Sequence, residues 1–142
     1  MNKAILLLGS NIEPESNIKK ALQMLRQKTK IIKVSSIYHT KAIGSDGPDF
    51  LNQAVIIETD LDKDEIKNEL IRFIELNLGR VRTKDKYAPR TIDVDLILFN
   101  SDIHDQNIWK FKFAALPVSE LNPNLTTPDD GRKLSDIIDC LN

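Results

Sequence analysis

Two carboxylates at alternate positions, with three arginines shortly before them, are the residues of this sequence whose types and spacing best suit chemistry. Asp93 and Asp95 stand within an apolar stretch, 92–98, that predicts a β-strand. Alternate side chains of a strand leave the same face, so the two carboxylates should lie together, about 7 Å apart at their Cα atoms. Without a cation they would repel and each would favour its neutral form. Mg²⁺ removes this conflict, because it prefers one or two carboxylates together with phosphate oxygens and water.

The arginines suggest what such a metal would accompany. Arg80, Arg82 and Arg90 can hold a planar or tetrahedral anion through forked hydrogen bonds. Acids and arginines together predict a site for Mg²⁺ and a polyphosphate. The alternative is a solvated face of an amphipathic sheet whose acids the arginines merely neutralise. The apolar neighbours disfavour it, because acids on an otherwise buried strand are costly unless they are paired or bound to metal.

The composition limits the classes of protein to which the chain can belong. The 142 residues are 41% hydrophobic and 29% charged, with a net charge of −1, so a single domain spanning 1–142 is expected, without bulk attraction to nucleic acid or membrane. The single cysteine, Cys140, excludes an internal disulfide and a Cys-based zinc cage. The apolar run 4–8 is too short for a signal peptide or a membrane span, so a cytoplasmic protein is expected. The sequence leaves the oligomeric state open.

The elements that must position these residues follow a simple order. Turn and cap signals together with hydrophobic periodicity predict the order strand, helix, strand, strand, helix, strand. The strands are expected at 3–8, ended by a turn at 9–11, at 31–38, at 52–59 and around Asp93 and Asp95. The first helix should open at Pro14, and the second should be capped by Asp60 or Asp62 and closed by Gly79. This order is the ferredoxin-like βαββαβ sandwich of the α+β class, an antiparallel sheet with helices on one face. A C-terminal extension should follow, with a strand at 111–116, a turn at 118–121 and a helix at 133–141.

Five motifs in order over the first hundred residues resemble one enzyme family. They are Leu8-Gly-Ser-Asn11, Val34-Ser-Ser-Ile-Tyr-His-Thr40, Pro48-Asp-Phe-Leu-Asn52, Ile74-Glu-Leu-Asn-Leu-Gly-Arg-Val-Arg82 and Ala88-Pro-Arg-Thr-Ile-Asp-Val-Asp-Leu96. The chain resembles 6-hydroxymethyl-7,8-dihydropterin pyrophosphokinase, a folate-biosynthesis enzyme with a ferredoxin-like core. The resemblance implies transfer of the diphosphoryl group of ATP to the pterin hydroxymethyl, with release of AMP.

The resemblance also implies roles for individual residues. Asp93 and Asp95 would bind two Mg²⁺ ions and, with Arg82 and Arg90, form the catalytic set. The ATP-binding residues would be Glu75, Arg80, Arg82, Tyr87 and Arg90, and the pterin-binding residues Thr40, Ile43, Phe50, Asn52 and Phe113. Taken without the resemblance, Phe50 and Phe113 are typical of core packing, and Asn52 of a turn or strand-edge amide.

One segment departs from the family pattern. Residues 100–112 are several residues shorter than in the family and lack its Pro-His pair, and Phe111 stands where an arginine is expected. Lys110 or Lys112 could supply a charge there, but lysine lacks the arginine fork. Three alternatives therefore stay open: a divergent pterin- and nucleotide-binding protein with reduced or no turnover, another Mg²⁺-dependent phosphotransferase, and a regulatory ferredoxin-like domain. The retained acids disfavour the first and third alternatives, and Phe50 with Asn52 disfavours the second.

Overall fold

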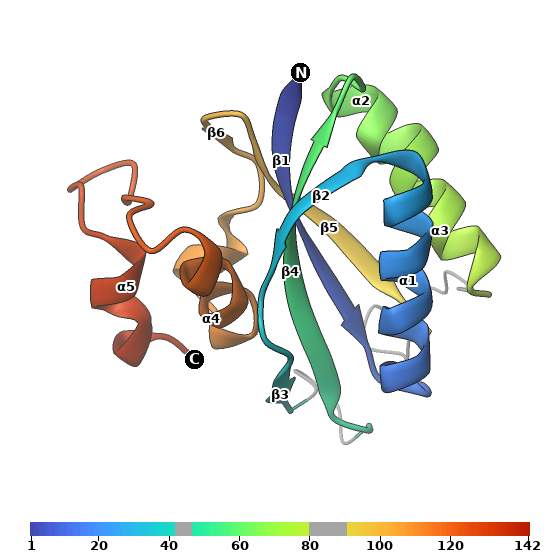
Figure 1. Ribbon diagram of the computed structural model, residues 1–142. Helices are drawn as coiled ribbons and strands as arrows, with labels where there is room; N and C mark the ends of the chain where they lie inside the picture. The colour runs from blue at the N-terminus through green and yellow to red at the C-terminus, as the bar shows by residue number, and fades with distance from the viewer. Residues whose placement is uncertain (42–46, 80–90) are drawn as a thin grey trace.

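A central antiparallel sheet organises the chain (Figure 1). The computed structural model describes residues 1–41, 47–79 and 91–142. Within these ranges the strands are β1 (Asn2–Ser10), β2 (Lys30–Val34), β3 (Tyr38–Thr40), β4 (Phe50–Thr59), β5 (Asp93–Phe99) and β6 (Asp102–Ile103). Their order is β2-β4-β1-β5-β6, with β3 also beside β4. The predicted succession of strands and helices up to Phe99 is therefore observed.

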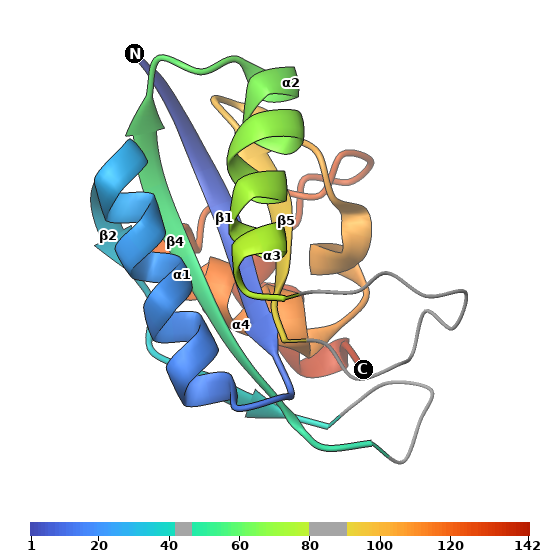
Figure 2. The same ribbon diagram turned by 90° about the vertical axis from the view of Figure 1, so that its right-hand side faces the viewer.

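One face of the sheet is covered by the two helical segments predicted for it. These are α1 (Pro14–Lys28) and a continuous run of α2 (Lys63–Glu65), the π-helical η1 (Ile66–Ile71) and α3 (Arg72–Asn77); they lie side by side over the sheet (Figure 2). Asp62 is the N-cap: its carboxylate accepts from the Glu65 N–H at 2.8 Å, and Glu65 accepts from the Asp62 N–H at 3.1 Å. Gly79 follows α3 with φ of +74°, a conformation that favours glycine.

The C-terminal extension covers the other face and differs from its prediction. It forms η2 (Gln106–Trp109), α4 (Lys112–Leu121), α5 (Leu134–Ile137) and η3 (Ile138–Cys140), which lie across the sheet from α1 and α3 (Figure 1). The strand predicted at 111–116 and the turn at 118–121 are wrong, because Phe111 is the N-cap of α4 and the residues after it in both segments belong to this helix. Pro117 inside α4 disfavours a helix on local grounds. Burial against the sheet outweighs that local penalty, since Ala114, Ala115 and Val118 are fully buried. Helices thus cover both faces, and the terminal helix is shorter than predicted.

Two strand boundaries also differ from the prediction. The strand expected at 31–38 is split, because β2 ends at Val34 and β3 begins at Tyr38. The first strand continues through Gly9 to Ser10 where a turn was expected, because these residues pair with Asn52 and Leu51 of β4. In the described ranges, no helix is both long and apolar enough to cross a membrane.

Candidate active site

Asp93 and Asp95 lie on the same face of the sheet, as the alternation of the strand predicts. β5 pairs with β1 so that Asp93 lies opposite Gly9 and Asp95 opposite Leu7. Val94 between them is buried on the other face, in the cluster under α1 and α3. Both acidic residues are half-buried. They are therefore neither on opposite faces nor sealed in the interior, the two placements that would have excluded a shared ligand.

Asn52, Gly9 and Asp93 form a row across three adjacent strands. Gly9 of β1 pairs with Asn52 of β4 on one side and with Asp93 of β5 on the other. Paired residues of an antiparallel sheet share a face, so the amide and the carboxylate rise on the same side, roughly two strand spacings or about 10 Å apart. A methyl group added at Gly9 would lie 3.0 Å from Oδ1 of Asn52. The absent side chain therefore lets the Asn52 amide and the Phe50 ring lie close over the backbone of Gly9.

Two further candidates adjoin the amide end of this row. Thr40 pairs with Phe50, and Tyr38 pairs with Asn52, along the contact of β3 with β4. The Asn52 side-chain amide donates to Oγ1 of Thr40 at 2.7 Å. Asn52 is only 3% exposed, so this hydrogen bond fixes the orientation of a buried amide. The structure therefore brings Thr40, Phe50 and Asn52 together, on the face that carries the acids.

Phe113 approaches this face from the helical extension. It lies in the first turn of α4, packs on the core cluster between the sheet and the C-terminal helices, and is half-buried. Its ring stacks on Phe111 with centroids 5.5 Å apart and an interplanar angle of 28°. Phe111, at the position where the resemblance expects an arginine, thus contributes an aromatic surface.

Glu75 reaches the acidic strand from the opposite helical layer. It lies in α3 and is 6% exposed. Its Oε2 accepts a hydrogen bond from the backbone N–H of Val94 at 3.4 Å. Val94 stands between the two aspartates, so this contact fixes the backbone from which Asp93 and Asp95 project.

The remaining predicted residues lie outside the part of the chain that the structure describes. They are Ile43, Arg80, Arg82, Tyr87 and Arg90. Among the described residues, no group of three or more His, Cys, Asp or Glu side chains could hold a metal ion. Two carboxylates such as Asp93 and Asp95 would suit Mg²⁺ completed by phosphate and water better than a metal held by protein ligands alone.

Glu120 of α4 is a residue of this region that the sequence reasoning missed. Its Oε1 accepts from the Tyr38 hydroxyl at 2.6 Å and its Oε2 from the Ser36 N–H at 2.9 Å. The hydrogen bond to Glu120 is the main reason that the pKa of Tyr38 is raised to about 12, and the same bond is the main reason that the pKa of Glu120 is lowered. These partners are more than 80 residues apart in sequence, so no local pattern could have revealed the contact.

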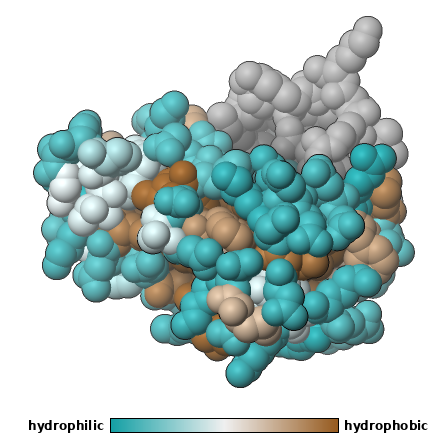
Figure 3. Space-filling model, turned by 90° about the horizontal axis from the view of Figure 1, so that it is seen from above, coloured by the Kyte–Doolittle hydropathy of each residue, from teal (hydrophilic) through white to brown (hydrophobic). Residues whose placement is uncertain are grey.

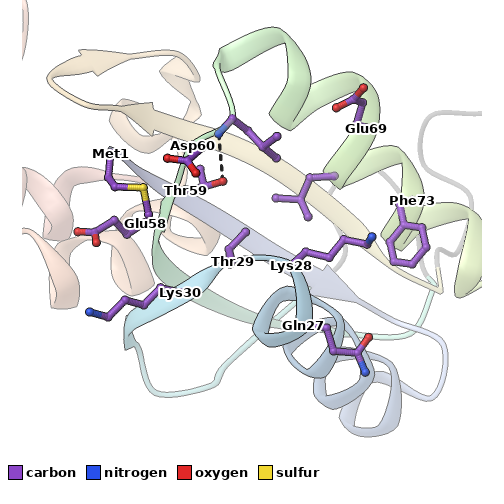
Figure 4. Close-up of a pocket in the computed structure, with 12 residues that line it drawn as sticks. Met1, Gln27, Lys28, Thr29, Lys30, Glu58, Thr59, Asp60, Glu69 and Phe73 are labelled. Carbon is purple, nitrogen blue, oxygen red and sulfur yellow. Dashed lines mark hydrogen bonds between the residues drawn. The ribbon is translucent and has the colours of Figure 1, made fainter.

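A separate hollow lies at the opposite end of the sheet, between α1 and the η1–α3 segment (Figure 4). It has a volume of about 810 Å³, and Lys28 extends along it to place Nζ 4.5 Å from the centroid of the Phe73 ring. Its lining mixes both charge signs, with Lys30, Glu58 and Glu69 among its residues. In Figure 3, which looks onto the end of the molecule that carries the N-terminus, hydrophilic residues dominate and hydrophobic ones appear in patches. The predicted site residues that the structure describes do not line this hollow.

Comparison with known proteins identifies close relatives. The sequence model of the family described as 7,8-dihydro-6-hydroxymethylpterin-pyrophosphokinase matches residues 5–123. The chain is 43% identical over 132 residues to the 2-amino-4-hydroxy-6-hydroxymethyldihydropteridine pyrophosphokinase of Bacillus subtilis, over 84% of this chain and 78% of that protein. It is 31% identical over 150 residues to the protein of the same name from Pseudomonas aeruginosa, over 97% and 91%.

Solved structures show the same fold at low identity. A variant of Plasmodium falciparum HPPK-DHPS with STZ-DHP matches with a TM-score of 0.74 at 13% identity, over 98% of this chain and 45% of that chain. The wild-type protein with pteroate matches with a TM-score of 0.72 at 13% identity, over 98% and 42%. The chain described here therefore spans less than half the length of these structures.

Proposed function

The chain belongs to the 7,8-dihydro-6-hydroxymethylpterin-pyrophosphokinase family, and from this membership we propose that it transfers the diphosphoryl group of ATP to the hydroxymethyl of 6-hydroxymethyl-7,8-dihydropterin in folate biosynthesis. The hydroxymethyl oxygen forms a bond to the β-phosphorus of ATP. The bond from that phosphorus to the oxygen bridging to the α-phosphorus breaks, the hydroxyl proton is released, and AMP leaves. The strand order β2-β4-β1-β5 supports assigning the first hundred residues to the ferredoxin-like topology.

One observation carries the proposal: the row of Asn52, Gly9 and Asp93 sets a fixed amide and a carboxylate on the same face, about two strands apart. An amide offers both a donor and an acceptor to the edge of a flat heterocycle, and aromatic rings offer stacking surfaces. Asn52 would therefore bind the pterin edge, with Phe50 and Phe113 against its faces. Thr40 holds the Asn52 amide, and Thr40 and Ile43 would add backbone contacts.

The acidic end would receive the nucleotide. Asp93 and Asp95 would hold two Mg²⁺ ions, a role that their shared face and partial exposure fit. Such ions, when bound, neutralise charge on the transferred group. Glu75, which the resemblance places among the ATP-binding residues, would also support the acidic strand by accepting from the backbone N–H of Val94. By the family resemblance, Arg80, Arg82, Tyr87 and Arg90 would hold the triphosphate and adenosine, aiding transfer by position and charge.

A second candidate function, binding of pterin and nucleotide without turnover, is favoured by one observation. Phe111, where the family pattern has an arginine, stacks on Phe113, so a guanidinium expected near the phosphates is replaced by an apolar ring. Charge stabilisation of a transferring phosphoryl group is worth orders of magnitude in rate. The two candidates therefore differ in turnover while agreeing on binding.

The test is incubation of the purified protein with ATP, Mg²⁺ and 6-hydroxymethyl-7,8-dihydropterin, with quantification of AMP, ADP and the pterin product. The proposal expects AMP and diphosphorylated pterin in equal amounts, and none when EDTA replaces Mg²⁺. A dihydropterin lacking the hydroxymethyl group is the control acceptor and should yield no AMP. Formation of ADP would indicate a different phosphotransferase, whereas ligand binding without AMP would establish the second candidate.

A further inference from the structure

The strand that carries Thr40 is short and begins after a break. β3 has only three residues, and residues 35–37 separate it from β2. The first residue of the break, Ser35, is hydrogen-bonded to β4. Its N–H donates to the Ala54 carbonyl at 2.9 Å, and its Oγ accepts from the Ala54 N–H at 2.9 Å. A three-residue edge strand gains little stability from its own ladder. Three backbone pairs with β4 and the ion pair of His39 with Asp49 hold it on one side, so a contact from outside the sheet adds a separate anchor.

Glu120 supplies those contacts from α4. One carboxylate oxygen accepts from the Ser36 N–H within the break, and the other accepts from the Tyr38 hydroxyl at the first residue of β3. Tyr38 pairs with Asn52, and Thr40, two residues later, accepts the hydrogen bond of the Asn52 amide. A chain of contacts thus runs from α4 through β3 to Asn52.

We infer that Glu120 is a positioning residue for the pterin half of the site, holding β3 against α4 so that Thr40 fixes the Asn52 amide. The inference rests on the proposed function, because it assigns Glu120 to the pterin and not to the nucleotide. α4 also carries Phe113. Glu120 therefore ties together two elements that would flank the same ring: the strand pair bearing Thr40 and Asn52, and the helix bearing Phe113.

The charge of Glu120 suits this role. Hydrogen bonds that involve an ionised acceptor are shorter and stronger than neutral ones, and the bond to Tyr38 is 2.6 Å. Glu120 is itself exposed, so its loss leaves no buried charge and should spare the fold. If this exposed contact only stabilised the surface, it would contribute little free energy, and its loss would change the binding of both substrates equally or not at all.

The experiment compares Glu120→Gln with the wild type in equilibrium binding of the pterin and of a non-hydrolysable ATP analogue with Mg²⁺, and in turnover. Glu69→Gln, the same change at an exposed glutamate of η1 in the helical layer on the opposite face of the sheet, is the matched control. We expect Glu120→Gln to raise the pterin Kd and KM about tenfold, leaving the ATP-analogue Kd and the melting temperature near the wild-type values. The control should change none of these quantities.

A second variant tests the route through Tyr38. Tyr38→Phe removes the hydroxyl and keeps the ring, so it should raise the pterin Kd by a smaller factor than Glu120→Gln. The double variant should bind the pterin no more weakly than Glu120→Gln alone, since both changes break the same hydrogen bond between Tyr38 and Glu120.

The outcomes separate this inference from the proposed function. Wild-type protein that fails to bind the pterin would overturn both. Wild-type binding with an unchanged pterin Kd in Glu120→Gln would overturn the inference alone, as would equal losses for pterin and ATP analogue.

Discussion

The two faces of the sheet differ at the end where β1 stops. Under α1 and α3 the face carries one large apolar cluster that includes Leu6, Leu8 and Val94. Its few polar residues are buried, such as Gln53 opposite Leu8. Under α4 the face is apolar at one end, around Ile5 and Leu7, and polar at the other, where the Asn52–Gly9–Asp93 row lies beside Asp95. The same three strands supply both faces, so the difference comes entirely from which side chains alternate outward.

The comparison shows how stability and chemistry are divided in this chain. One face buries the larger of the two apolar clusters, and this burial contributes strongly to folding. The other stops burying apolar groups where the polar row begins, so changes there should affect ligands more than the fold. Four substitutions test this difference between the two faces.

Asp95→Ala should have the largest effect. Removing one of two carboxylates proposed to hold Mg²⁺ should lower kcat about a thousandfold or more. Stability should change little, because the Asp95 side chain is half-buried and lies outside both apolar clusters. AMP release under saturating substrates and urea unfolding measure the two quantities. Asp102→Ala, at an exposed acid of β6, is the control. Near-normal turnover of Asp95→Ala with Mg²⁺ present would refute the metal assignment.

Leu6→Ala should show the reverse pattern. Leu6 is fully buried in the cluster under α1 and α3, so its truncation should lower the free energy of unfolding by about 2–5 kcal/mol. The pterin Kd of the folded fraction should stay near the wild-type value. Urea unfolding and fluorescence titration at low temperature measure these quantities. A large change in pterin affinity without loss of stability would contradict the division between the faces.

Gly9→Ala should separate the site from the strand that carries it. The new methyl would lie 3.0 Å from Oδ1 of Asn52, so the amide has to move by a few tenths of an ångström, which disturbs its hydrogen bond to Thr40. We expect the pterin Kd to rise about fivefold to tenfold. Stability should be equal or slightly higher, because glycine in a strand is entropically costly. Isothermal titration measures the pterin Kd, and thermal melts measure the stability. Lower stability with an unchanged pterin Kd would contradict the prediction.

Tyr38→Phe should give the smallest effect, visible in the pH dependence of stability. The folded-state pKa of Tyr38, about 12, lies above its usual value of 10.0. A raised pKa of this kind contributes stability that is complete below pH 10 and is lost as the pH rises toward 12. The wild type should therefore lose more stability than Tyr38→Phe between pH 9 and pH 11, roughly the accessible part of that window. Urea unfolding at each pH measures the stability of both proteins. If the stability of the wild type and of Tyr38→Phe fell in parallel with pH, the titration of Tyr38 would not report its contact with Glu120.

Much of the site geometry was open to prediction because it depends on local periodicity. The shared face of Asp93 and Asp95 follows from the two-residue repeat of a strand. The start of the second helical run at Asp62 follows from a capping box within four residues. The helix α4 was not predictable in this way, because Phe111 and Phe113 alternate as in a strand and Pro117 argues against a helix. Burial of Ala114, Ala115 and Val118 against the sheet outweighed both signals.

Side-chain types and short spacings were enough to predict the order of strands and helices up to Phe99, the common face of the two carboxylates and the family that the motifs resemble. These properties reside in side-chain types and short spacings, which every part of the chain carries before it folds. Only the tertiary structure decided that Asn52 and Asp93 flank Gly9 in one row, that the C-terminal extension packs as helices on the second face, and that Glu120 meets Ser36 and Tyr38. Each of these depends on strand register or on partners distant in sequence, which are fixed when apolar surface is buried and not by local conformational preference.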